Sequence, residues 1–258
     1  MKPALQTHGL GVRFGAFQAV NDVHLSLEPG ARQALIGPNG AGKTTLINLL
    51  TGVIKPTAGR IEMDGQDITG FAADRRARMG LARTFQINTL FPSLTPLLSV
   101  VLAISEREGL GAVWWRPLTR HKALFDEAHA LLGRLKLDAL ADVPVAELAY
   151  GKQRLLEIAL AMAAKPRILL LDEPAAGVPE DESGELFEAI AELPQDISVL
   201  FIEHDMKHVF RFSRRISVLV AGQILTEGTP AEIGADVRVR EVYLGHAHAG
   251  VPAGVAHG

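Results

Sequence analysis

The sequence predicts an α/β fold built around a mainly parallel sheet, and three observations support this prediction. The first is a set of near-continuous apolar runs separated by helical segments, at 168–171, 198–202 and 216–220. Such runs are typical of parallel strands that are buried on both faces. The second is a glycine-rich turn between the apolar run 34–36 and a helical stretch over 44–50. The third is a β-rich segment over the first thirty residues.

The N-terminal region predicts an antiparallel β subdomain. Apolar and polar residues alternate there in the period-2 pattern of a half-buried strand, with the apolar positions at Val23, Leu25 and Leu27. The apolar run 61–63, followed by Asp64-Gly65, predicts a hairpin with a two-residue turn. Gly52 follows the helical stretch and suits the left-handed C-cap of that helix.

The middle of the chain predicts a helical insertion. From about Pro92 to Pro144 apolar residues recur at helical spacing among charged ones, as at Leu124, Ala128, Leu131 and Leu135. We therefore expect one domain over residues 1–245, with a helical subdomain inserted at about 92–160. The residues 246–258 are Ala, Gly, His, Val and Pro, and we expect a flexible C-terminal tail there.

Composition excludes several classes of protein. The 258 residues include no cysteine, which removes disulfide scaffolds, thiolate metal sites and cysteine nucleophiles. The 26 basic and 29 acidic residues give a formal charge of −3, so we expect no nucleic-acid partner. No apolar stretch approaches the roughly 20 residues that cross a bilayer, and no secretion signal begins the chain. We expect a soluble protein retained in the cytosol.

The strongest motif is Gly37-Pro38-Asn39-Gly40-Ala41-Gly42-Lys43-Thr44, a full match to the phosphate-binding loop. Glycines allow successive backbone N–H groups to converge on phosphate oxygens, and the following helix presents its positive N-terminus to the same anion. Lys43 reaches the β- and γ-phosphates, and the Thr44 hydroxyl can ligate Mg²⁺. We expect ATP to bind at Gly37, Pro38, Asn39, Gly40, Ala41, Gly42, Lys43, Thr44 and Thr45.

A second motif places two carboxylates, Asp172 and Glu173, at the end of a buried strand. Ligands of open α/β sheets bind at that edge. We expect Asp172 to hold Mg²⁺, directly or through water, and Glu173 to polarise the water that attacks the γ-phosphorus. The alternative is purely structural, because an apolar run followed by an acid is common on its own.

Further motifs resemble those of ATP-binding cassette (ABC) proteins over nearly the whole chain. The signature motif of the family resembles the segment Leu148-Ala149-Tyr150-Gly151-Lys152-Gln153-Arg154. Gln86 resembles the glutamine of the Q-loop, and His204 resembles the switch histidine. Phe14 stands where the family places an aromatic residue on the adenine. The resemblance implies a P-loop NTPase fold of the ABC ATPase type, catalytic roles for Lys43, Gln86, Glu173 and His204, and metal binding by Thr44, Gln86 and Asp172.

Each of these residues also has a structural interpretation. Phe14 is alternatively a core residue, Gln86 a surface residue at a strand end, and His204 a satisfied structural histidine. The histidines of the tail lack a carboxylate or cysteine and do not predict a metal site; Trp114-Trp115 predicts either a contact patch or an ordinary aromatic pair.

The resemblance also implies partners. In this family the signature residues, here Ala149, Tyr150 and Gly151, bind the ATP held by the other subunit of a head-to-tail dimer. One phosphate loop and one signature per chain therefore imply a second ABC ATPase subunit, identical or different. The resemblance further implies membrane permease subunits, an extracytoplasmic binding protein acting indirectly, and a peripheral location at the cytoplasmic face of the inner membrane.

More narrowly, the sequence resembles the branched-chain amino-acid importer ATPases. The forms that carry this are Leu148–Gly151, Glu173–Gly177, Ile202–Met206 and Val242–Gly245. Lipopolysaccharide-transport ATPases, non-transport ABC ATPases and P-loop kinases are the alternatives.

Two residues depart from the family pattern. Ala149 stands where serine is frequent, so one hydrogen bond to the opposing γ-phosphate is absent. Pro179 stands near a position usually held by aspartate or asparagine, and it removes both a side-chain partner and an N–H. We expect weaker communication between the two ATP sites at Pro179.

Overall fold

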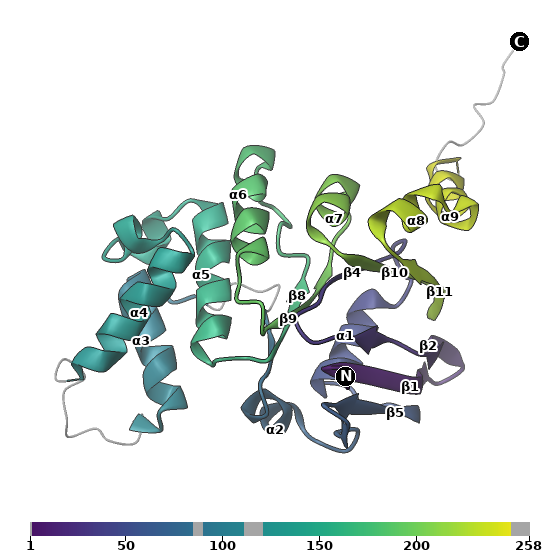
Figure 1. Ribbon diagram of the computed structural model, residues 1–258, viewed down its shortest axis with the longest axis horizontal. Coiled ribbons are helices and arrows are strands. Elements are labelled where there is room, and N and C mark those ends of the chain that lie inside the picture. Colours follow the sequence, from purple (N-terminus) through teal and green to yellow (C-terminus); the bar gives the residue numbers. More distant parts are fainter. Residues whose placement is uncertain (1, 85–89, 111–120, 249–258) are drawn as a thin grey trace, which may run out of the picture.

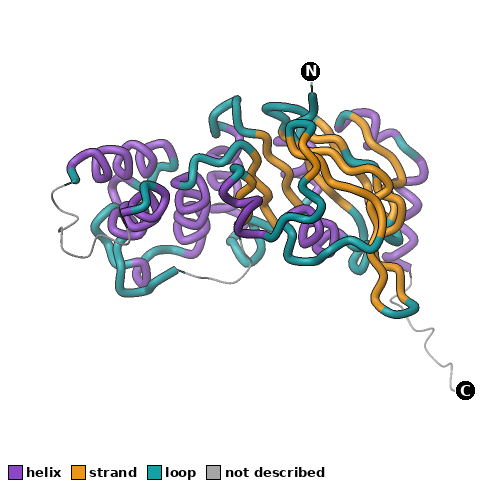
Figure 2. Tube along the Cα trace, turned by 90° about the horizontal axis from the view of Figure 1, so that it is seen from below, coloured by secondary structure: helices purple, strands orange, loops and turns teal. Residues whose placement is uncertain are grey.

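The computed structural model describes residues 2–84, 90–110 and 121–248. It is an α/β protein with two sheets and a group of helices set beside them. Figure 2 shows a group of helices at one end of the molecule, and the strands with further helices beside them towards the other end. The predicted fold class is confirmed.

The core sheet has six strands in the order β11-β10-β4-β9-β8-β7. Neighbouring strands from β10 to β7 run parallel, and β11 pairs antiparallel with β10 at one edge. The three apolar runs are strands of this sheet, as predicted. The strands are β4 (Arg32–Ile36), β7 (Leu81–Arg83), β8 (Ile168–Asp172), β9 (Ser198–Ile202), β10 (Arg215–Val220) and β11 (Gln223–Gly228).

Both faces of the core sheet are buried. Along β8, Leu169 and Leu171 belong to one apolar cluster, whereas Ile168 and Leu170 belong to another. Helices cover the first face, and the second face packs against α1 and the N-terminal sheet (Figure 1). This two-sided burial explains why the sequence shows continuous apolar runs instead of alternation.

The second sheet is antiparallel, as predicted. Its order is β2-β1-β5-β6, with β3 pairing with β1. Its strands are β1 (Leu5–Phe14), β2 (Phe17–Val23), β3 (Ser26–Leu27), β5 (Ala58–Met63) and β6 (Gln66–Asp67).

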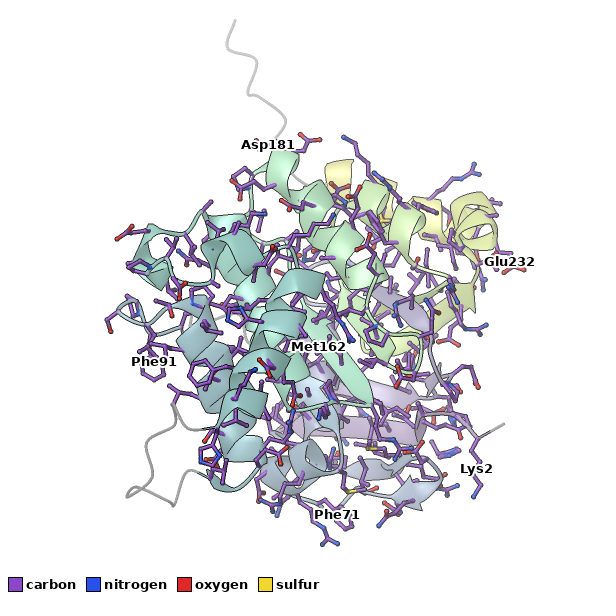
Figure 3. All side chains as sticks on the ribbon, turned by 60° about the vertical axis from the view of Figure 1, so that its left-hand side comes forward. Lys2, Phe71, Phe91, Met162, Asp181 and Glu232 are labelled. Atoms are coloured by element: carbon purple, nitrogen blue, oxygen red, sulfur yellow. The ribbon has the colours of Figure 1, made fainter. Side chains whose placement is uncertain are left out.

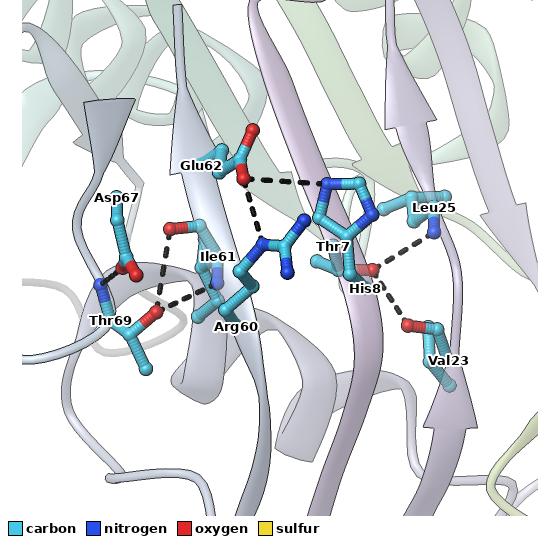
Figure 4. Close-up of polar contacts among 9 residues, drawn as sticks. All are labelled: Thr7, His8, Val23, Leu25, Arg60, Ile61, Glu62, Asp67 and Thr69. Carbon is cyan, nitrogen blue, oxygen red and sulfur yellow. Dashed lines mark hydrogen bonds and ion pairs between the residues drawn. The ribbon is translucent and has the colours of Figure 1, made fainter. Parts of the chain in front are cut away.

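The alternating segment predicted as one strand is split between two. β2 ends at Val23, and β3 contains only two residues. The interruption lies at Leu25, whose N–H donates to the Thr7 hydroxyl oxygen instead of a carbonyl, while the Thr7 hydroxyl donates to the Val23 carbonyl (Figure 4). A side chain thus replaces one step of the backbone ladder.

The predicted hairpin is present between β5 and β6. Asp64 and Gly65 have φ values of 53° and 80°, the left-handed pair that a two-residue turn requires. Beside it, the Thr69 hydroxyl accepts the Ile61 N–H at 2.9 Å, and Glu62 accepts the Arg60 guanidinium at 2.8 Å (Figure 4).

The helix predicted after the glycine-rich turn is present, and Gly52, with φ 80°, is its C-cap. The α-helices are α1 (Lys43–Thr51), α2 (Ala73–Arg78), α3 (Pro96–Arg107), α4 (Lys122–Arg134), α5 (Tyr150–Ala163), α6 (Glu180–Ala191), α7 (Met206–Phe212), α8 (Pro230–Ala235) and α9 (Val237–His248). Two short 3₁₀ turns, η3 (Asp138–Leu140) and η4 (Val145–Glu147), precede α5.

Helices α3, α4 and α5 pack against one another. On α4 the buried residues are Leu124, Ala128 and Leu132, while Leu131 is only partly buried. Leu135 is buried as well, so three of the four predicted positions lie in the apolar cluster, and Leu132 is buried beside the partly buried Leu131. Helix α5 continues to Ala163 and joins this region to the core sheet through contacts with α6 and β7.

The C-terminal helix extends further than expected. The predicted tail begins at residue 246, whereas α9 continues through His248. Tyr243 packs against the main apolar cluster, which anchors this helix to the domain. Over the described ranges of the chain, no helix is both long and apolar enough to span a bilayer.

Candidate functional site

The glycine-rich turn between β4 and α1 has a backbone that only glycine accepts at two positions. Gly37 and Gly42 have φ values of 157° and 102°. A Cβ on Gly37 would lie 2.1 Å from the Leu219 carbonyl oxygen, and one on Gly42 would lie 2.6 Å from the Ala19 oxygen. The left-handed Gly42 is also the N-cap of α1, so the turn delivers the chain directly into a helix N-terminus.

Lys43 lies folded over this turn. Its Nζ donates to the carbonyl oxygens of Gly37 and Pro38 at 2.7 and 3.1 Å. Burial lowers the pKa of the ammonium group below its usual value, and the carboxylates of Glu173 and Asp172 oppose this. The cation is therefore held at the turn, close to two acidic groups.

A cavity of about 350 Å³ opens over the turn. It brings together four parts of the chain: the start of β2, the turn after β4, the residue after β8 and the residues after β9. Its lining consists of Phe17, Ala19, Asn39, Gly40, Ala41, Gly42, Lys43, Thr44, Thr45, Glu173 and His204. Gly37 and Pro38 stand behind this lining and hold Lys43.

Glu173 and His204 form a pair at the edge of the cavity. His204 Nε2 lies 2.5 Å from Glu173 Oε1, and His204 is half-exposed. Glu173 has φ 51°, a left-handed conformation that a non-glycine residue adopts only where its surroundings impose it. The N–H of Glu173 donates to the Ile202 carbonyl of the neighbouring strand, which fixes this turn. The arrangement suits a carboxylate that accepts a proton beside an imidazole.

Asp172 lies beneath the cavity, not in its lining. Its side chain is fully buried, and Oδ2 accepts Arg83 at 2.7 Å, while Arg83 also donates to Asn48 of α1. Burial raises the pKa of the Asp172 carboxyl, and the bond from Arg83 offsets only part of this rise. Asp172 Oδ1 is buried without a hydrogen-bond partner in the described part of the chain.

Sequence reasoning missed Arg83. Gln86, three residues further along, was the residue predicted to be functional in this segment, and it lies outside the described residues. A basic residue that ends a strand next to an acid-ended strand was the available signal, because parallel neighbours bring their carboxyl ends together.

The aromatic residue in the cavity lining is Phe17, not Phe14. The two are cross-strand partners at the tip of the β1–β2 hairpin, and they are 50% (Phe14) and 65% (Phe17) exposed. Phe17 was not predicted to be functional, because a motif position alone does not distinguish the two sides of a hairpin turn.

The predicted signature residues lie elsewhere, at the N-terminus of α5. Ala149 is the N-cap and provides no side-chain cap. The N–H of Gly151 instead donates to Glu182 Oε2 of α6 at 2.9 Å. Neither Ala149, Tyr150 nor Gly151 lines the cavity over the glycine-rich turn. The N-terminus of α5 and the glycine-rich turn before α1 therefore do not share one cavity.

Trp114-Trp115 and the residues beyond 248 lie outside the described residues. Within the described ranges, no group of three or more His, Asp or Glu side chains forms a metal cluster. Tyr243 of α9 approaches the glycine-rich turn: burial raises the pKa of its hydroxyl to about 12, although the Gly37 backbone hydrogen bond lowers it.

The fold and the site define a P-loop nucleotide-binding protein of the ATP-binding cassette type. The family model described as "ABC transporter" matches residues 20–176, and that of the "Branched-chain amino acid ATP-binding cassette transporter" matches 223–249. The chain belongs to the ABC transporter family.

Curated relatives match over nearly their whole length. The high-affinity branched-chain amino acid transport ATP-binding protein LivG of Escherichia coli (strain K12) is 43% identical over 253 residues, which cover 95% of this chain and 99% of LivG. BraF of Pseudomonas aeruginosa, described in the same words, is 41% identical with the same coverage.

Solved structures agree in fold. The ADP conformation of MJ1267, an ATP-binding cassette of an ABC transporter, superimposes with a TM-score of 0.83 at 31% identity, covering 95% of this chain and 100% of that one. A nucleotide-free ABC cassette gives a TM-score of 0.81 at 31% identity, covering 93% and 98%.

Proposed function

We propose that this protein is the ATP-hydrolysing subunit of an ABC importer for branched-chain or related amino acids, acting at the cytoplasmic face of the cell membrane. The observation that carries the proposal is the cavity in which the phosphate loop, Glu173 and His204 meet. It occurs in a chain that aligns with 99% of LivG, a relative whose name states this transport role.

The phosphate loop binds the triphosphate of ATP. The N–H groups of the turn and the N-terminus of α1 face the anion, as the glycine backbone permits. Lys43 exchanges its bonds to the carbonyl oxygens of Gly37 and Pro38 for phosphate oxygens. Phe17 lies where it can stack on the base, a position that the sequence assigned to Phe14.

Glu173 orients and activates the attacking water, and His204 holds the γ-phosphate and Glu173 in register. Their contact of 2.5 Å places a proton acceptor and an imidazole together at the cavity edge. Phosphoryl transfer depends mostly on positioning and charge neutralisation. The strained turn at Glu173 fits this demand, since it fixes the carboxylate before substrate binds.

The donors present also fit Mg²⁺. The orphaned Asp172 Oδ1 and the exposed Thr44 hydroxyl are oxygen ligands of the kind this ion prefers. Asp172, Thr44 and the Q-loop Gln86 would hold the ion, directly or through water, with the remaining positions taken by water and phosphate. When bound, Mg²⁺ neutralises charge on the β- and γ-phosphates.

The signature turn completes the site of a second subunit. Its N–H groups at the start of α5 bind the γ-phosphate of ATP held by a partner cassette in a head-to-tail dimer. Permease subunits, contacted by the helical region, convert the closing and opening of that dimer into transport. An extracytoplasmic binding protein acts indirectly through the permease.

A single substitution tests the hydrolytic role. Glu173→Gln keeps the shape of the side chain but removes the proton acceptor, so it should retain ATP binding and trap a closed dimer. The matched control is Glu180→Gln, an exposed carboxylate on α6 that pairs with Lys207. Undiminished phosphate release by Glu173→Gln would contradict the assignment.

Cargo requires the assembled transporter. Vesicles containing the cassettes and their permease should show ATP-dependent uptake of leucine, isoleucine or valine in the presence of the binding protein. The cassette alone does not define cargo, since a protein named for ribose import, RbsA 1 of Rhizobium meliloti, is also 34% identical over 93% of this chain. Uptake of a sugar but no amino acid would contradict the proposed cargo.

A further inference from the structure

The loops that follow β8 and β9 are tied together by one buried carboxylate, that of Glu203. Its Oε1 accepts the N–H of Ala175 at 3.1 Å, and its Oε2 accepts the N–H of His204 at 3.0 Å. Glu203 is only 6% exposed, although it lies next to a half-exposed histidine. Burial of a charge is unfavourable unless hydrogen bonds compensate it, so the two backbone hydrogen bonds are needed to offset the desolvation of Glu203.

The two N–H groups belong to the backbone that carries the Glu173–His204 pair. Ala175 lies two residues after Glu173, and its N–H sets where the turn after β8 runs. The second N–H is that of His204 itself. A shift of either loop changes the separation of Glu173 and His204, which interact at 2.5 Å. We propose that Glu203 is a positioning residue for ATP hydrolysis, which acts by fixing Glu173 and His204 relative to each other.

This inference rests on the proposed function and predicts a selective defect. Glu203→Gln keeps the size of the side chain but offers only one oxygen for two N–H donors. We expect kcat to fall about tenfold, since one charge-assisted hydrogen bond is lost, while the dissociation constant for ATP changes less than about twofold. The side-chain hydrogen bonds of Glu203 go to Ala175 and His204 and not to the phosphate loop, which should bind ATP as before.

Two controls separate positioning from general damage. Glu227→Gln alters another partly buried carboxylate, on the edge strand β11. Glu227 accepts hydrogen bonds from Ser217 and Arg215 of β10, and its substitution should leave kcat unchanged. In a His204→Ala background, Glu203→Gln should lower the residual kcat by a smaller factor than in the parent, because the part of its effect that acts through His204 is already lost. Thermal unfolding confirms that each variant is folded.

An unchanged kcat in folded Glu203→Gln overturns the inference, as does an equal fall in the His204→Ala background. These results differ from failure of the proposed function, in which the unsubstituted chain itself does not hydrolyse ATP or His204→Ala has full activity.

A different contact carries a second inference. The N–H of Gly151, in the signature turn, donates to a carboxylate oxygen of Glu182 in the first turn of α6 at 2.9 Å. The adjacent Lys152 is bound to Glu185 of the same helix at 2.7 Å. An N–H at a helix N-terminus binds carboxylate and phosphate oxygens by the same interaction. We infer that Glu182 occupies the position of the partner's γ-phosphate and must leave when the dimer closes on ATP.

The test measures ATP-dependent dimer formation in the Glu173→Gln background by light scattering at increasing ATP concentration. Glu182→Ala should lower the half-saturating ATP concentration about tenfold, because a charge-assisted hydrogen bond no longer competes. Glu182→Gln should give a smaller shift. Asp181→Ala is the control, because it removes the same charge one residue away, at the outward end of α6 where Figure 3 labels Asp181.

Equal behaviour of Glu182→Ala and Asp181→Ala overturns the inference, since only general charge repulsion would then act. A requirement for more ATP in Glu182→Ala also overturns it, because Glu182 would then stabilise the binding conformation. If the Glu173→Gln parent never dimerises, with or without a second cassette, the proposed function fails instead.

Discussion

The two helix N-termini that are proposed to bind one ATP from opposite sides are built in different ways. The turn before α1 obtains its shape from glycines, and its N-cap Gly42 has φ 102°. The turn before α5 begins at Ala149 with extended backbone, has no cap of its own, and takes the carboxylate of Glu182. The first turn is preorganised by its own sequence, whereas the second depends on the adjacent helix α6.

This difference indicates where binding energy and control reside. The α1 turn keeps its conformation through local backbone geometry and is suited to hold nucleotide in one subunit. The α5 turn has an anion-binding N–H that is already satisfied, so its engagement with a second nucleotide requires an exchange of partners.

The largest effect should follow loss of the cation at the α1 turn. Lys43→Ala removes the side chain that donates to both Gly37 and Pro38, and it removes the positive charge that we expect to contact the β- and γ-phosphates. ATP hydrolysis should fall by at least about a hundredfold. Phosphate release measures this, and Lys55→Ala, a lysine beyond α1, is the control. Hydrolysis within about twofold of the parent would contradict the assigned role.

At the α5 turn, a substitution that adds a hydrogen-bond donor should strengthen ATP-dependent dimerisation. Ala149→Ser supplies the hydroxyl that the family pattern often has there. A hydrogen bond to a charged group contributes about 1.5–3 kcal/mol, so ATP-dependent dimerisation should tighten by about ten- to a hundredfold. Titration in the Glu173→Gln background measures it. No change would indicate that residue 149 does not face the partner's nucleotide.

The aromatic pair offers a sharper test of the α1 side. Phe17→Ala should raise the dissociation constant for ATP by at least about fivefold, because stacking on a base contributes about 1–3 kcal/mol. Phe14→Ala should change it less, because Phe14 does not line the cavity. Fluorescent-nucleotide binding compares the two variants directly. The reverse order would support the position chosen from the sequence.

The smallest effect concerns the helical region that carries the α5 turn. The Arg107 guanidinium, aided by Lys165, lowers the pKa of Glu127 to about 2. A carboxyl with a lowered pKa stabilises the fold above about pH 4.5 and loses that contribution as pH falls towards about 2. Glu127→Gln should therefore cost less than about 1 kcal/mol at pH 7.

Chemical denaturation at several pH values checks this contribution. The difference between Glu127→Gln and the parent should shrink as the pH falls below about 4.5. A difference that is constant with pH would mean that Glu127 contributes by packing instead of charge.

Local patterns made the fold and half of the site predictable. The phosphate loop is contiguous, and its glycines state their backbone requirement in the sequence itself, as at Gly37 and Gly42. The apolar runs identified the parallel strands, and strand ends located Asp172, Glu173 and His204 at one sheet edge.

Residues that act through tertiary contacts were not predictable in this way. Arg83 meets Asp172 only because β7 and β8 are neighbours, although 89 positions separate the two residues. Glu182 of α6 accepts the N–H of Gly151 of α5 although 31 positions separate the two residues. Phe17 instead of Phe14 lines the cavity because of how one hairpin lies over the turn. None of these partners follows a period or a motif.

The central proposal is that the α1 turn of one subunit and the α5 turn of another bind the same nucleotide. Disulfide cross-linking tests it most directly, because the chain has no cysteine of its own. Cysteines introduced at Asn39 and Lys152 in the Glu173→Gln background would lie on the two turns. The proposal predicts an oxidative cross-link between two chains that forms only with Mg-ATP. Cross-linking that is absent or independent of ATP, for the chain alone and with a companion cassette, would contradict it.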